Sequence, residues 1–123
     1  MPKITMEMSK GAYEIAKKVY SNQMTRTAGS IEINRVTGMN QSSAHAFVTI
    51  FLAMMNGEVY KRAFNNQTNK FLLESIRQDF GEESWRNALN AVQKHIDYYS
   101  TLGSGNLTGL QQIVNQMALK IPL

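Results

Sequence analysis

The sequence of 123 residues contains no cysteine. The chain therefore forms no disulfide and has neither a thiol nucleophile nor a cysteine-based zinc or iron–sulfur site. It also lacks any run of about 18 apolar residues, so we expect no transmembrane helix. Its N-terminus has no apolar segment followed by a cleavage site, as a secretory signal would. These absences predict a cytoplasmic protein without a cofactor or a membrane partner.

Charged residues are also few. They make up 18% of the chain against 43% hydrophobic residues, a balance that favours one ordinary core over disorder. The length predicts a single helical domain over 1–123. The net charge of +4 favours a polyanionic partner. Asn and Gln number 11 and 8, and such amides either read base edges or form a polar surface of low charge.

The spacing of apolar residues predicts an all-α protein of five to six short helices, because several segments repeat at helical spacing and none alternates with period two. Trp85, Ala88, Leu89, Val92, Ile96 and Tyr99 form the clearest amphipathic stripe. The expected helices cover about residues 6–20, 25–37, 41–55, 68–80, 82–99 and a last segment from 108 on.

Several helix ends are marked by capping residues. Thr25 is the expected N-cap of the second helix, which buries Ala28, Ile33 and Val36 and stops at a left-handed Gly38. The glycines at 103 and 105 predict a hinge before the last helix. There, Thr108 and Gln111 match a capping box, and Pro122 ends the helix.

Catalytic motifs are absent from the sequence. It contains no phosphate-binding loop and no H-E-x-x-H, and its two histidines, His45 and His95, are 50 positions apart. We expect His95 to lie beside the buried Ile96 and to form a hydrogen bond there. The sequence therefore predicts neither an enzyme nor a metal site.

Residues 31–47 resemble a helix-turn-helix, with a Gly38-Met39 turn between two helices. In that geometry Asn40, Gln41, Ser42, His45 and Thr49 face a DNA groove, where such side chains donate to and accept from base edges. Met39, Ala44 and Phe47 would face inward. The small residue usual four positions before the turn glycine is here Asn34. A plain helical corner without a DNA partner explains the same pattern.

Basic and aromatic residues alternate in the connector 58–66. Tyr60, Lys61 and Arg62 lie within it, and Lys70 follows. This mixture suits contacts with phosphates and stacking on a sugar or base. The alternative is a solvated loop in which Tyr60 and Phe64 anchor the connector to the core.

Five short sequence motifs follow one another along the chain. They are Ala12-Tyr13-x-x-Ala16-Lys17-x-Val19-Tyr20, Gly38-Met39-Asn40-x-x-Ser43-Ala44, Met55-x-Gly57-x-x-Tyr60-x-Arg62, Ile76-x-x-Asp79-Phe80-Gly81 and His95-Ile96-Asp97-Tyr98-Tyr99. Their spacing over about 8–116 resembles the N-terminal helical domain of bacterial His-Asn-His (HNH) endonucleases of the methylcytosine-restriction type.

The resemblance implies a non-catalytic module that reads modified or specific duplex DNA for an associated nuclease domain. A flipped methylated base would need an aromatic pocket, for which Tyr60, Trp85 and Tyr98 are the candidates, although Trp85 also suits the core. The implied partners are double-stranded DNA, methylated or not, and a nuclease domain or another protein.

A competing hypothesis is a helical protein-interaction or oligomerisation module, such as a phage or defence regulator. Eight methionines favour it, because methionine forms adaptable hydrophobic surfaces. The apolar segment 47–55 would then pair with a second copy of itself.

Overall fold

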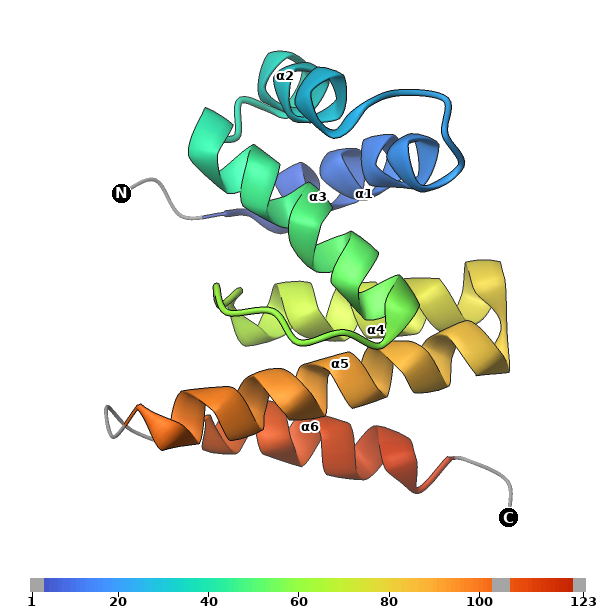
Figure 1. Cartoon of the computed structure of the whole chain (residues 1–123), viewed down its shortest axis with the longest axis vertical. Coiled ribbons are helices and arrows are strands. Elements are labelled where there is room, and N and C mark those ends of the chain that lie inside the picture. The colour runs from blue at the N-terminus through green and yellow to red at the C-terminus, as the bar shows by residue number, and fades with distance from the viewer. Residues whose placement is uncertain (1–3, 103–106, 121–123) are drawn as a thin grey trace. The chain divides into compact units, whose positions relative to one another are not determined.

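The helices predicted from the sequence are present in the computed structural model, which describes residues 4–102 and 107–120. Within those residues the chain forms six α-helices and no strand, so the all-α fold is confirmed. The helices are α1 (Met6–Tyr20), α2 (Arg26–Thr37), α3 (Gln41–Asn56), α4 (Asn66–Phe80), α5 (Glu82–Thr101) and α6 (Thr108–Ala118) (Figure 1).

Side-chain caps explain where several helices begin. Thr25 accepts a hydrogen bond from the backbone N–H of Ala28, as predicted. Asn65 caps α4 through the N–H of Thr68, so this helix starts two residues before the predicted position.

The predicted capping box of α6 is wrong. Its N-cap is Leu107, which provides no side-chain hydrogen bond, and the amide of Gln111 binds the side chains of Gln93 and Asn115 instead. The predicted hinge at 103–105 and the end at Pro122 lie outside the described residues.

Contacts divide the chain into two compact units, 1–52 and 53–123, with the boundary inside α3. The single domain expected over 1–123 stays a prediction. Within the first unit, α1 and α2 pack side by side as an antiparallel hairpin (Figure 1). A Cβ built on Gly11 would lie 2.6 Å from Thr37 Cγ2, and one on Gly29 would lie 2.5 Å from Val19 Cγ2. The two backbones approach closely because these positions are glycines.

The predicted inner face of α2 needs correction. Ile33 is fully buried, but Ala28 is exposed and Val36 retains 54% of its accessible surface. The buried positions beside Ile33 are Gly29 and Ser30. Small residues therefore form this contact, because larger ones would hold α2 away from α1.

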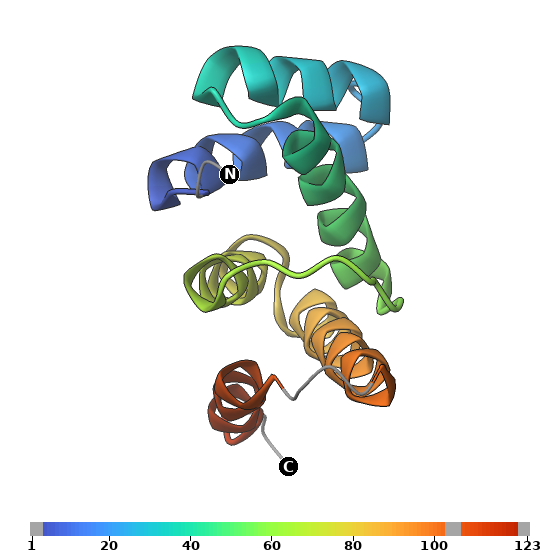
Figure 2. The same ribbon diagram turned by 90° about the vertical axis from the view of Figure 1, so that its left-hand side faces the viewer.

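In the second unit, α4, α5 and α6 pack against one another (Figure 2). Gly81 lies between α4 and α5 with φ +93°, so the predicted stop at this residue is confirmed. The amphipathic stripe of α5 is buried from Trp85 to Ile96, and Tyr99 is half-buried. No helix among the described residues is long and apolar enough to cross a membrane.

Candidate nucleic-acid interface

The turn between α2 and α3 is held by two side chains from the last part of α2. Gly38 adopts the left-handed conformation with φ +76°, as predicted. Asn34 Nδ2 donates to the carbonyl of Met39 at 2.7 Å, and Thr37 Oγ1 accepts from the N–H of Met39 at 3.1 Å. Figure 2 shows α3 leaving α2 in a new direction at this point. These bonds set the direction in which α3 begins.

The residues expected to face inward at this corner do so. Met39, Ala44 and Phe47 have 1% or less of their surface exposed. Asn34, where helix-turn-helix proteins usually have a small residue, supplies the hydrogen bond that holds the turn. The buried Met39 and the hydrogen bonds to its backbone therefore fix the position of the first residues of α3.

Four of the five residues expected to face a groove are exposed, namely Asn40, Gln41, Ser42 and His45, whereas Thr49 is half-buried. Asn40 Oδ1 accepts from the N–H of Ser42 at 2.8 Å, so this side chain also caps α3. Gln41 Nε2 donates to Ser30 Oγ at 2.9 Å, which links α3 to α2. The His45 side chain makes no hydrogen bond, ion pair or ring contact with any described residue.

The α3 helix carries no Asp, Glu, Lys or Arg. Nearby on α2, Arg35 is paired with Glu32, and this hydrogen bond lowers the pKa of the Glu32 carboxyl. The corner is therefore rich in neutral hydrogen-bonding groups and poor in unpaired charge. It suits base edges or a polar protein surface better than it suits phosphates.

The three predicted phosphate-binding cations belong to the second unit and are all exposed. Lys61 and Arg62 lie in the irregular connector 57–65, and Lys70 lies on α4. Lys61 Nζ lies 5.5 Å from the centre of the Tyr98 ring. This contact holds the ammonium near α5 while leaving it accessible to an anion.

Tyr60 is not at the surface beside these cations. Only 4% of it is exposed, and its ring stacks on His95 with ring centres 4.3 Å apart. Its role in contacting a nucleic acid stays a prediction, and the ring itself is enclosed in this structure. The alternative explanation holds, since burial of the large apolar ring anchors the connector to the core.

Two of the three rings expected to form a pocket for a flipped base, Tyr60 and Trp85, are buried. Trp85 is 1% exposed, and the Arg77 guanidinium lies 4.3 Å from the centre of its ring. Tyr98 is half-buried under Lys61. With Tyr60 also buried, two of the three candidate rings belong to the core.

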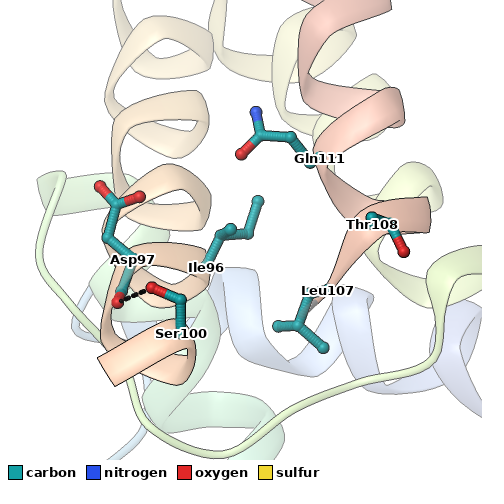
Figure 3. Close-up of a pocket in the computed structure, with 6 residues that line it drawn as sticks. All are labelled: Ile96, Asp97, Ser100, Leu107, Thr108 and Gln111. Atoms are coloured by element: carbon teal, nitrogen blue, oxygen red, sulfur yellow. Dashed lines mark hydrogen bonds between the residues drawn. The ribbon is translucent and has the colours of Figure 1, made fainter. Parts of the chain in front are cut away.

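An open pocket of about 300 Å³ lies between α5 and α6, lined by Ile96, Asp97, Ser100, Leu107, Thr108 and Gln111 (Figure 3). Three of its polar side chains, those of Asp97, Ser100 and Gln111, already have partners within the protein. Ser100 Oγ donates to the carbonyl of Asp97, and Gln93 Nε2 donates to the Asp97 carboxylate at 3.0 Å. Its lining contains no aromatic ring and no cation.

The described residues contain no group of three or more histidine and acidic side chains that could hold a metal. His95, expected to flank the buried face and to bond locally, is itself buried, and its hydrogen bond reaches the carbonyl of Tyr60, 35 positions earlier. Sequence reasoning missed this partner, together with the role of Asn34. Only the position of Asn34 relative to Gly38 could have indicated its role, since no local pattern reveals a partner 35 residues away. No protein-family model, curated protein or solved structure matches the chain.

Proposed function

We propose that this chain is a non-catalytic module that binds double-stranded DNA and reads bases with the start of α3. The observation that carries the proposal is the set of exposed neutral side chains at the start of α3, where Asn34 and Thr37 hold the backbone of the buried Met39. Gln41 and His45 are the principal readers, because an amide and an imidazole both donate and accept at base edges. Asn40 and Ser42 flank them at the same helix end.

The phosphate contacts of the proposed module come from Lys61, Arg62 and Lys70. All three are exposed, and the chain has a net charge of +4. Because α3 lacks charged residues, these cations would supply the salt-dependent part of the affinity while the corner supplies the sequence preference. Such a module acts in the cytoplasm.

The resemblance to the N-terminal domain of HNH endonucleases supports one further step. The module would deliver an associated nuclease domain to specific or methylated sites. The ligand is then duplex DNA, methylated or unmodified. Cleavage of that DNA would be the work of the associated nuclease domain and not of this module.

Fluorescence anisotropy of labelled duplexes, unmodified and cytosine-methylated, tests the proposal at about 50 and 200 mM salt. We expect binding that weakens steeply with salt. Replacing Gln41 or His45 by Ala should reduce the discrimination between DNA sequences. The expected loss is about 1–3 kcal/mol for each well-formed contact between a side chain and a base that the substitution removes. Failure to bind either duplex at the lower salt would contradict the proposal.

A protein-interaction or oligomerisation module is the second candidate function. It is favoured by α2, on which Ile31 and Val36 are each more than half exposed. The methionine argument does not support it, because Met39, Met54, Met55 and Met117 are buried and no described methionine is exposed. Sedimentation distinguishes the two functions, since a tight dimer that retards no DNA at low salt would favour this alternative.

A further inference from the structure

The irregular connector 57–65 is attached to α5 by a succession of contacts. Lys94 Nζ donates to the carbonyl of Gly57 at 2.7 Å, and His95 binds the carbonyl of Tyr60 at 2.6 Å. Next in order, Lys61 lies over the ring of Tyr98. Just before the connector, Asn87 Nδ2 donates to the carbonyl of Met55 at 3.2 Å.

The four α5 residues form one row along the helix, which we call the α5 row: Asn87, Lys94, His95 and Tyr98. They follow one another at intervals of 7, 1 and 3 positions, which places them within about 100° of one another on a helix of 3.6 residues per turn. Their partners occur in the same order along the chain. The connector therefore runs beside α5 in a single defined path.

His95 is the buried member of the α5 row, with 1% of its surface exposed. A carbonyl oxygen only accepts, so His95 Nδ1 carries the proton and donates to Tyr60. The imidazole also stacks on the Tyr60 ring with an angle of 11° between the planes, and Tyr99 lies 5.8 Å away. One side chain thus holds both the backbone and the ring of Tyr60.

We propose that His95 is a positioning residue for nucleic-acid binding. By fixing Tyr60, it sets where the next two residues, Lys61 and Arg62, present their charges to a phosphate backbone. The inference rests on the proposed function, which assigns these two cations to phosphates. Its physical basis is preorganisation, because a connector that is already ordered loses less conformational freedom when DNA binds.

Hydrogen exchange of the full chain, measured without DNA, tests whether His95 fixes the connector. His95→Phe keeps an aromatic ring against Tyr60 but removes the donor. We expect exchange in the peptide covering 57–65 to accelerate about tenfold, the scale set by one buried hydrogen bond. Val92→Ala, a fully buried α5 position outside the row, is the matched control for general destabilisation and should leave this peptide protected.

Fluorescence anisotropy with an unmodified duplex at low salt tests whether His95 positions Lys61 and Arg62 for binding. His95→Phe should weaken binding about fivefold, the scale of immobilising one or two long side chains. The same substitution should have no further effect when Lys61 and Arg62 are both Ala. A purely structural role would weaken binding equally in both backgrounds.

Two results of the exchange experiment would also overturn the proposal. One is unchanged exchange of the connector in His95→Phe, and the other is an equal acceleration in Val92→Ala. If the wild-type chain binds no duplex, the proposed function fails and the presentation of phosphate-binding charges fails with it. The exchange experiment would still decide whether His95 holds the connector, so the two failures are distinguishable.

Discussion

Replacing Gly29 by Ala tests the close approach of α1 and α2. The new Cβ would lie 2.5 Å from Val19 Cγ2, a separation that nonbonded carbon atoms do not adopt. Val19 is 7% exposed and β-branched, so its side chain has one strongly preferred rotamer in a helix and cannot move aside. The backbones would have to separate.

The magnitude follows from two opposing effects. Alanine in place of glycine inside a helix stabilises by about 1 kcal/mol. Overpacking a close contact costs about 1–3 kcal/mol. We expect a net loss of about 1 kcal/mol in the free energy of unfolding, measured by equilibrium urea unfolding, with a fall in melting temperature of about 4 °C.

Gly109→Ala is the matched control. Its Cβ would lie 2.6 Å from Asn66 Nδ2, the far end of an exposed and flexible side chain that can rotate away. This variant should keep the helix gain and be more stable than the wild type, by up to about 1 kcal/mol. Equal stabilisation by both substitutions would refute the close packing of α1 against α2.

Three further outcomes are expected. Asn34→Ala leaves the Met39 carbonyl without its donor, so unfolding free energy should fall by about 1 kcal/mol, and a wild-type urea midpoint would contradict the role of this bond. Burial lowers the pKa of His95, so between that value and about 6.5 the unfolded chain binds more protons and stability is lost as the pH falls. Urea midpoints at about pH 8 and pH 5 should therefore differ less in His95→Phe than in the wild type. Replacing Lys61 and Arg62 together by Ala should flatten the slope of log affinity against log salt by about 0.9 for each phosphate that is no longer neutralised, and an unchanged slope would rule them out as phosphate ligands.

Local signals were sufficient for most of the fold. Capping by Thr25 and the left-handed Gly38 follow from short-range chemistry, so the helix ends they mark agree with prediction. The inner face of α2 was mispredicted because its buried positions include Gly29 and Ser30. These residues allow close packing because they are small, and a pattern of hydrophobic residues does not reveal them.

The candidate site was predictable only in part. The inward Met39, Ala44 and Phe47 follow from helical spacing across a glycine turn. The basic residues that follow Tyr60 predict an accessible ring at this position. Its burial depends on stacking with His95, a contact between distant parts of the sequence that no local pattern encodes.

The central claim is that the start of α3 meets the bases of duplex DNA. Titration of isotope-labelled protein with a short duplex, followed by amide chemical shifts, tests it most directly. We predict the largest changes at residues 40–49 and at Lys61 and Arg62, and His45→Ala should reduce the changes at its neighbours on α3. Changes confined to α2 around Ile31 and Val36, or none at all, would contradict it.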